Sequence, residues 1–192
     1  MKKGILSLAL AIVFGISANA TEPINGEKKI VKTEQSKVTW KAYKVGGGHT
    51  GTIGLKSGFL VFDSKKLTGG EFVVDMTTLV TTDDLGDMKS KLEGHLKSDD
   101  FFGVEAHPTA KLAFTKATSF NKNSYTVIGD LTIKGITKPI TFVVSIFGNK
   151  ATATLKVDRA KYNVKYNSGS FFKNLGDKTI YDEFDLVVDL EF

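Results

Sequence analysis

The fold is decided by a stretch that alternates apolar and polar side chains on both sides of a short turn. It runs Val127-Ile128-Gly129-Asp130-Leu131-Thr132-Ile133-Lys134-Gly135-Ile136-Thr137-Lys138-Pro139-Ile140-Thr141. Leu131 and Ile133 share one face with Val127, and Ile140 resumes the pattern after the turn at Lys134-Gly135. Alternation with a period of two around a two-residue turn predicts two antiparallel strands with one apolar face.

The same alternation continues through the rest of the chain. Short turns separate the segments, and a glycine-rich region from His49 to Asp63 belongs to the series. About eight such segments predict an all-β fold, an antiparallel up-and-down β-barrel, because closure removes exposed sheet edges. Further alternating apolar positions are Val38, Trp40 and Ala42; Ile53, Leu55, Phe59 and Val61; Phe72, Val74 and Met76; Leu112 and Phe114; Phe142, Val144 and Ile146; Ala151, Ala153, Leu155 and Val157; Phe184, Leu186, Val188, Leu190 and Phe192.

One short helical insert interrupts these strands. Thr81 or Thr82 is expected to cap it, and the carboxylates of Asp83 and Asp84 favour the positive end of a helix. The insert ends before an adjacent aromatic pair, Phe101-Phe102. We expect residues 83–102 either to cover the barrel mouth and govern access to it or to plug one end of the core. The apolar stripe expected on the helix is Leu85, Met88, Leu92 and Leu96.

The first 20 residues have the order of a Sec signal peptide. Two lysines follow Met1, an apolar run extends to Gly15, and Ala18-Asn19-Ala20 forms a small-x-small cleavage site. Residues 1–20 are therefore predicted to direct the protein to the periplasm. Residues 21–37 are polar and are expected to be an extended N-terminal lead-in. Residues 38–192 are expected to form the barrel domain.

Composition narrows the function further. The chain has no cysteine, which excludes disulfides, thiol catalysis and lipid attachment to a cysteine. Residues 1–20 carry two lysines and no acids, so the remainder keeps 24 basic and 21 acidic side chains, a net charge of +3. This mild excess favours solubility and does not indicate nucleic-acid binding.

Catalytic patterns lack the context that they need. Ser168-Gly169-Ser170 does not have the spacing of a nucleophile elbow. His49, His95 and His107 are too far apart in sequence to form a recognisable metal motif, so structural or pocket-rim roles are favoured over a zinc site. We expect no catalytic residues, no metal, no cofactor and no enzymatic activity.

Several motifs in the right order resemble the YceI-like family. They are Ser36-Lys37-Val38-Thr39-Trp40, Gly48-His49-Thr50-Gly51, the stretch from Gly94 to Ala110, the stretch from Val127 to Thr141, Asp158-Arg159-Ala160-Lys161-Tyr162 and Tyr166-Asn167-Ser168-Gly169-Ser170-Phe171-Phe172. The resemblance implies a secreted, lipocalin-like barrel that binds a polyisoprenoid or another long-chain apolar lipid. It does not by itself identify the lipid.

The interior of such a barrel is either filled by side chains or holds one ligand. The chain has 14 phenylalanines, whereas Gly54, Gly129, Ala151 and Ala153 are small residues at expected inward positions, so both outcomes stay open. For Arg159, a structural ion pair is favoured over contact with a lipid head group, which would also involve Lys161 or Lys165. The candidate ligand-binding residues are Trp40, His49, Phe59, Phe101, Phe102, Phe142, Arg159, Phe171 and Phe172.

The leading hypothesis is a periplasmic binding or carrier protein for such a lipid, acting as a monomer or homodimer with no integral membrane span. Two alternatives remain. The terminal run Phe184, Leu186, Val188, Leu190 and Phe192 resembles the last strand of an outer-membrane barrel. The other alternative is an enzyme acting on a periplasmic lipid.

Overall fold

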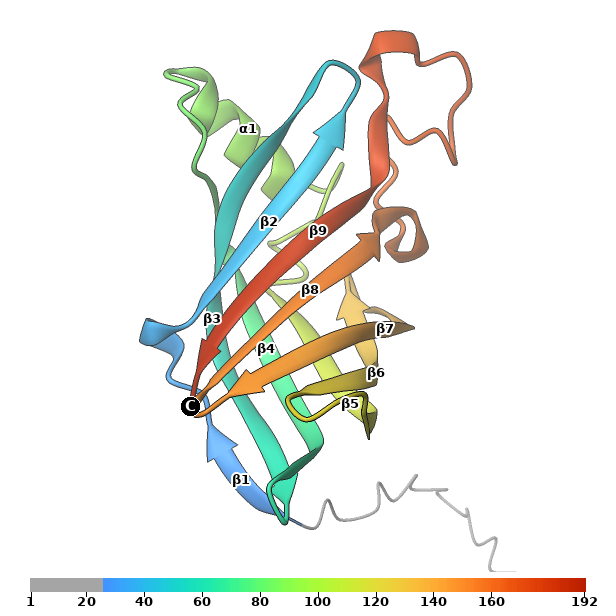
Figure 1. Cartoon of the computed structure of the whole chain (residues 1–192). Coiled ribbons are helices and arrows are strands. Elements are labelled where there is room, and N and C mark those ends of the chain that lie inside the picture. The colour runs from blue at the N-terminus through green and yellow to red at the C-terminus, as the bar shows by residue number, and fades with distance from the viewer. Residues whose placement is uncertain (1–25) are drawn as a thin grey trace, which may run out of the picture.

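Residues 26–192 are described by the computed structural model, and they form one antiparallel sheet with one α-helix (Figure 1). The strands are β1 (Glu27–Ile30), β2 (Lys37–Lys44), β3 (Gly47–Asp63), β4 (Lys66–Thr81), β5 (Thr109–Ser119), β6 (Ser124–Ile133), β7 (Ile136–Phe147), β8 (Lys150–Asp158) and β9 (Ile180–Glu191). The helix α1 is Met88–Lys97, and 3-10 turns occupy Thr33–Gln35, Arg159–Tyr162 and Gly176–Lys178.

Strands β2 to β9 close into an eight-stranded antiparallel barrel. Neighbours along the sheet follow the order β3-β2-β9-β8-β7-β6-β5-β4, and a further pairing between β3 and β4 completes the circle. The predicted all-β, up-and-down barrel with one helical insert is confirmed. Closure satisfies the backbone groups of every barrel strand on both sides, which an open sheet does not do.

The sheet starts earlier in the chain than residue 38. Strand β1 lies within the predicted lead-in and pairs with residues 59–62 of β3, next to the part of β3 that pairs with β2. Residues 21–25 of the lead-in, like the predicted signal peptide, lie outside the described residues.

The two ends of the barrel differ. At one end, here called the closed end, lie the β3–β4, β5–β6 and β7–β8 hairpins and the C-terminus (Figure 1). Phe62 and Phe192 pack there with ring centroids 5.7 Å apart, beside the buried Leu67. At the other, here called the helix end, lie the β2–β3 hairpin, α1 with the segment 98–108, the β6–β7 turn and the β8–β9 connection.

Inward-facing residues form the core, as the alternation predicts. All the expected apolar positions on β7, β8 and β9 belong to the core cluster or pack against it. The β6–β7 turn has Lys134 and Gly135 at φ of 50° and 71°, which is the geometry of the two-residue turns that match strand twist.

Strand β3 departs from the simple alternation. Its register against β4 shifts between Leu55 and Ser57, so that Leu55 faces inward before the irregularity and Leu60 faces inward after it. One inserted residue moves every later side chain to the opposite face. Phe59 therefore points outward, where the ammonium of Lys28 lies 3.6 Å from its ring centroid.

The predicted start of the helix is wrong. Thr81 ends β4, and its hydroxyl donates a hydrogen bond of 2.8 Å to the carbonyl of Thr50 on β3. The amide of Thr82 donates to the same carbonyl at 2.9 Å, so this backbone belongs to the sheet. The helix begins seven residues after Thr81, and Asp87 precedes it without a side-chain cap hydrogen bond.

The predicted apolar stripe of α1 is also mostly wrong. Leu85 precedes the helix and Met88 is 57% exposed, whereas Leu96 packs against the core. The helix contacts the barrel through Leu96 and through Glu93, whose carboxylate accepts a hydrogen bond of 2.9 Å from the Thr81 amide. Within residues 26–192, no helix is both long and apolar enough to cross a membrane.

Candidate functional site

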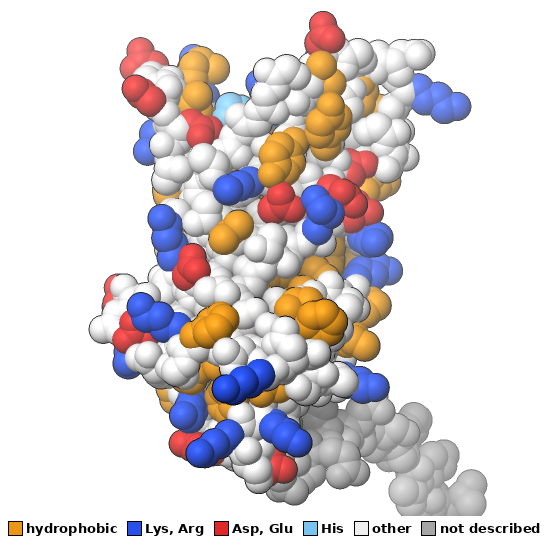
Figure 2. All heavy atoms as spheres, viewed as in Figure 1, with side chains coloured by type: hydrophobic (Ala, Val, Ile, Leu, Met, Phe, Trp, Pro, Cys, Tyr) orange, Lys and Arg blue, Asp and Glu red, His pale blue; other side chains and the backbone are white. Residues whose placement is uncertain are grey.

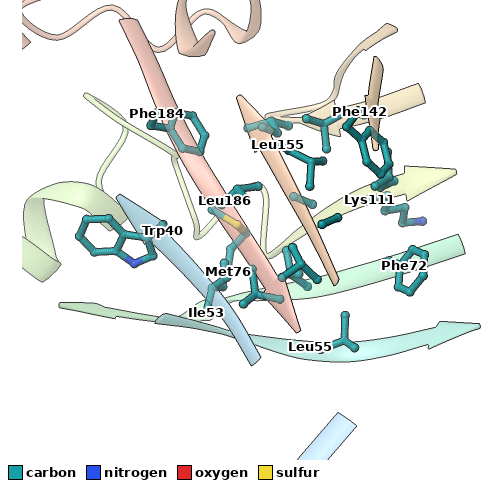
Figure 3. A pocket seen from close by; sticks show the side chains of 18 of the residues that line it. Trp40, Ile53, Leu55, Phe72, Met76, Lys111, Phe142, Leu155, Phe184 and Leu186 are labelled. Carbon is teal, nitrogen blue, oxygen red and sulfur yellow. The ribbon is translucent and has the colours of Figure 1, made fainter. Parts of the chain in front are cut away.

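The barrel interior contains a cavity of about 170 Å³, counted as space open to the centres of water-sized molecules. Its wall is almost entirely apolar and draws on all eight barrel strands (Figure 3). Trp40, Ile53, Met76, Phe142, Phe184 and Leu186 are among the residues that line it. The interior is thus partly filled by aromatic side chains and partly open.

Several inward residues are only partly buried because they face this cavity. Leu112, Leu186 and Val188 pack against the core and also line the open space. Ala151 and Ala153 line it as predicted, whereas Gly54 is exposed and its amide donates to the Thr78 hydroxyl at 2.7 Å. A wall that is almost entirely apolar favours an apolar chain over a polar solute, which would lose its hydrogen bonds with water.

Five predicted site residues line the cavity: Trp40, Phe101, Phe102, Phe142 and Arg159. Trp40 is held in place by two contacts. Its indole nitrogen donates to the Val80 carbonyl at 3.2 Å, and its ring lies against Gly51, where any side chain would collide with both groups. Glycine at this position therefore leaves the space that the tryptophan ring occupies.

The other four predicted ligand-binding residues, His49, Phe59, Phe171 and Phe172, are not among the residues that line the cavity. Phe59 points outward for the reason given above. The imidazole Nδ1 of His49 lies 2.8 Å from a carboxylate oxygen of Asp83 and fastens β3 to the segment after β4. Phe171 and Phe172 lie in the connection between β8 and β9, where strand alternation does not orient side chains, and are 42% and 49% exposed.

The segment after α1 closes the helix end. Phe101 in this segment is only 7% exposed. Its ring centroid lies 5.0 Å from that of His95 and 5.3 Å from that of Tyr166, and the Arg159 guanidinium lies 5.8 Å from its ring. Phe101 therefore joins α1 to the β8–β9 connection across the barrel mouth.

Lys134 holds this segment from a third side. Its ammonium donates to the carbonyls of Asp99 and Phe101 at 3.1 and 2.8 Å. Its backbone has φ of 50°, a conformation that costs energy for a residue other than glycine. The sequence pattern identifies Lys134 only as a turn residue, since no local signal connects it with a segment more than 30 residues away.

Arg159 ties the β8–β9 connection to the barrel. It is 4% exposed and donates to the carbonyls of Val164 at 3.1 Å, Ile180 at 3.0 Å and Tyr181 at 3.2 Å. Burial lowers the pKa of the guanidinium, and Asp182, 3.4 Å away, opposes that change. These contacts support the structural role, because three of the five guanidinium N–H groups bind the backbone.

The three histidines do not converge. The His49 imidazole contacts the carboxylate of Asp83, and the His95 imidazole lies 3.4 Å from that of Asp100. Neither contact includes His107. Burial disfavours the ionised Asp83, but hydrogen bonds from His49, Thr50 and Thr81 outweigh it and lower its pKa. Across residues 26–192, no three His, Asp or Glu side chains are arranged as metal ligands.

Comparison with known proteins identifies the family. A family model described as the YceI-like domain matches residues 30–192. The chain belongs to the YceI-like family. It is 31% identical over 150 residues to a UPF0312 protein of Pseudomonas putida strain W619, covering 77% of this chain and 74% of that one. A UPF0312 protein of Vibrio campbellii is 29% identical over 150 residues, covering 77% and 76%.

Solved structures share the fold of this YceI-like domain. BcnA of Burkholderia cenocepacia superposes with a TM-score of 0.66 at 24% identity, covering 83% of this chain and 98% of that one. A polyisoprenoid binding domain from Saccharophagus degradans superposes with a TM-score of 0.60 at 14% identity, covering 87% and 99%. At these identities the likeness establishes the barrel and leaves the ligand to be argued from the cavity.

Proposed function

We propose that the protein is a periplasmic binding or carrier protein for a long-chain apolar lipid, of the polyisoprenoid type, held inside the barrel. The observation that carries the proposal is the cavity, whose wall is almost entirely apolar and extends from Leu60 to Phe101. The polyisoprenoid binding domain of Saccharophagus degradans, which shares the barrel, supports the choice of lipid class.

The free energy of burial suffices for useful affinity. Each buried methylene contributes about 0.8 kcal/mol, so a chain that buries about 15 of them gains about 12 kcal/mol. Association and chain ordering cost about 4 kcal/mol or more. At most ~8 kcal/mol then remains, which corresponds to a micromolar dissociation constant. Recognition of this kind depends on the length and shape of the chain more than on its chemistry.

The outer wall favours this function over an outer-membrane barrel. Charged residues stand on outward faces between the two ends, for example Lys41, Lys156 and Asp185, and Figure 2 shows acidic and basic side chains spread over the face in view. An outer-membrane barrel has an apolar outer band and a polar interior. Here the polarity is the reverse.

The apolar cavity also favours binding over catalysis. Apart from the exposed Lys111, Arg159 is the charged residue among those that line it, and its donors bind backbone carbonyls. General acid-base chemistry needs a titratable group within reach of the reacting bond. Bound lipid is therefore expected to be recovered unchanged after prolonged incubation with the protein, as judged by mass spectrometry.

The periplasmic location rests on residues 1–20. The proposed Sec signal peptide predicts that a Lys2→Glu/Lys3→Glu variant is exported more slowly, because the positive n-region directs insertion. Fractionation of cells that express the full chain, with detection of the protein in the periplasmic extract, checks the location. Recovery of the wild type only in the cytoplasm contradicts it.

A cavity-filling variant tests the binding site itself. Ala153→Phe places a ring in the cavity, whereas Thr154→Phe places the same ring on the exposed face of the same strand. A fluorescent isoprenoid is titrated into wild type and both variants, and a headless hydrocarbon of equal length is then added as competitor. We expect a micromolar or tighter dissociation constant for wild type and Thr154→Phe, and at least about tenfold weaker binding to Ala153→Phe.

Circular dichroism is the control that checks whether both variants keep the barrel. If wild type binds neither probe, or if a short polar solute competes fully, the carrier function is wrong. Equal binding by Ala153→Phe and Thr154→Phe places the ligand outside the cavity.

A further inference from the structure

The β8–β9 loop, residues 163–179, carries two exposed phenylalanines that binding in the cavity does not explain. The loop leaves the barrel at the helix end, where its Tyr166 ring lies 4.4 Å from that of His95 on α1, and the remainder projects beyond the strands (Figure 1). Phe171 and Phe172 are 42% and 49% exposed although they adjoin each other. Two neighbouring aromatic side chains in water are unfavourable unless a partner covers them.

The backbone around Phe171 and Phe172 is held in place by hydrogen bonds, so their exposure does not result from a loose segment. Ser168 is fully buried, and its carbonyl accepts hydrogen bonds from the amides of Phe171 and Phe172 at 3.2 and 2.9 Å. The Ser170 hydroxyl donates to Asp182 at 2.7 Å. Arg159 fixes both ends of the loop through the carbonyls of Val164 and Ile180. The protein therefore presents the pair to solvent on an ordered turn.

Basic side chains outnumber acidic ones in the loop that carries the pair. From residue 161 to residue 178 the chain has four lysines, at 161, 165, 173 and 178, and a single acid, Asp177. The Lys165 ammonium lies 5.2 Å from the centroid of the Phe171 ring. Across the mouth, residues 83–105 carry seven acids and three lysines. The rim of the helix end is thus mainly basic on the loop side and acidic on the helix side, and the two sides meet where Asp99 and Asp100 line a hollow with Lys165 and Phe172.

We propose that the β8–β9 loop docks the barrel on an anionic lipid surface, with Phe171 and Phe172 inserted between head groups and the flanking lysines near the lipid phosphates. Aromatic side chains set among lysines have the composition of segments that bind at the membrane interface. The acidic side of the rim is repelled by the same surface, which tilts the barrel onto the loop.

Docking of this kind deepens the proposed function, since it brings the helix end of the cavity next to a source of lipid. It does not depend on which lipid the cavity holds. The closed end also has exposed phenylalanines, Phe120 at 70% and Phe147 at 59%, but they stand singly on separate hairpins, and the core packed around Phe62 separates that end from the cavity. They provide a matched control.

Vesicle flotation tests the inference. The purified protein is mixed with phosphatidylcholine vesicles, or with vesicles that also contain phosphatidylglycerol, at low and at high salt. We expect binding to the anionic vesicles that weakens with salt, and little binding to the neutral ones. The variant Phe171→Ser/Phe172→Ser should bind at least about tenfold more weakly, and Lys165→Glu/Lys173→Glu at least about fivefold per lysine. The control Phe120→Ser/Phe147→Ser should bind like wild type.

Three results overturn the inference: no binding of wild type to anionic vesicles, equal binding to neutral ones, or an equal loss in the Phe120/Phe147 control. A second copy of the chain is the other partner that could cover Phe171 and Phe172. Sedimentation velocity without vesicles tests for it, because self-association that is lost in the Phe171→Ser/Phe172→Ser variant identifies the second copy as the partner. The vesicles contain no isoprenoid, so failure here leaves the isoprenoid titration unaffected, and failure of that titration leaves this result interpretable.

Discussion

The two ends of this barrel are built from the same strands but are stabilised in different ways. At the closed end, apolar side chains such as Phe62, Leu67 and Phe192 fill the interior and pack against one another. At the helix end, Phe101 and Phe102 cover the mouth. Lys134 holds this segment through the Phe101 carbonyl, whereas Arg159 lies 5.8 Å from the Phe101 ring and binds carbonyls of the β8–β9 connection.

This difference suggests that one end controls the stability of the barrel and the other controls ligand access to the cavity. A densely packed plug resists opening because any movement exposes apolar surface, whereas a few hydrogen bonds to carbonyls can exchange with water at small net cost. Segments that open locally are held by few buried contacts. We therefore expect the closed end to determine the free energy of unfolding and the helix end to determine the rate at which a ligand enters and leaves.

The largest expected effect concerns the side chains packed at the closed end. Leu67→Ala removes a side chain that is 2% exposed and should lower the free energy of unfolding by about 3 kcal/mol or more. Leu112→Ala removes the same atoms from the cavity wall, where space already exists, and should cost about 1 kcal/mol. Urea denaturation of both variants measures the difference, and equal losses would show that the two regions are packed alike.

A smaller loss, about 2–3 kcal/mol, is expected for Arg159→Met, because three carbonyls and the half-buried Asp182 lose their partner. The loss should be local. Hydrogen exchange should accelerate at the amide of Ile180, which bonds to Asn167 at 2.9 Å, and stay slow in β6. Lys161→Met, at an exposed site on the same turn, is the control and should change neither quantity.

Lys134→Asn should remove the hydrogen bonds to the segment after α1 while keeping the β6–β7 turn. Asparagine tolerates positive φ but cannot reach the carbonyls of Asp99 and Phe101. Stability should change by less than about 1 kcal/mol, while a bound fluorescent isoprenoid should dissociate several times faster. Stopped-flow release from this variant and from Lys138→Asn, on the same hairpin, measures the effect. Unchanged release would mean that the segment around Phe101 does not control access.

The smallest expected effect on stability concerns Asp185, on the barrel wall between the two ends. A hydrogen bond from Tyr43 at 2.7 Å, and next the Lys156 ammonium at 3.1 Å, lower the pKa of Asp185. A depressed folded-state pKa contributes stability above the unfolded value of about 3.9, and this is lost as the pH falls through the folded value. Asp185→Asn should remove up to about 1 kcal/mol of stability at neutral pH and flatten the acid dependence below about pH 4. Thermal melts from pH 7 to about pH 2 check it, with the exposed Asp189→Asn as control.

The barrel could be predicted because strand alternation is a local signal. Residues such as Leu131, Phe142 and Leu155 repeat every second position, and that repeat by itself determines which face is buried. The same signal identified Trp40 and Phe142 as inward residues. It failed at Phe59, because the irregularity near Ser57 leaves no distinct mark in the composition.

The sequence by itself determined the antiparallel strands, the single helical insert and the family, since each depends on the order of residues along a few turns or strands. The tertiary structure decided that α1 starts after Thr82 and that Phe101 is buried while Phe171 and Phe172 are exposed. It also decided that Lys134 and Arg159 hold the mouth, because their partners come from other segments of the chain. Whether the interior is filled depends on how facing side chains from eight strands meet, and no local pattern contains that sum of volumes.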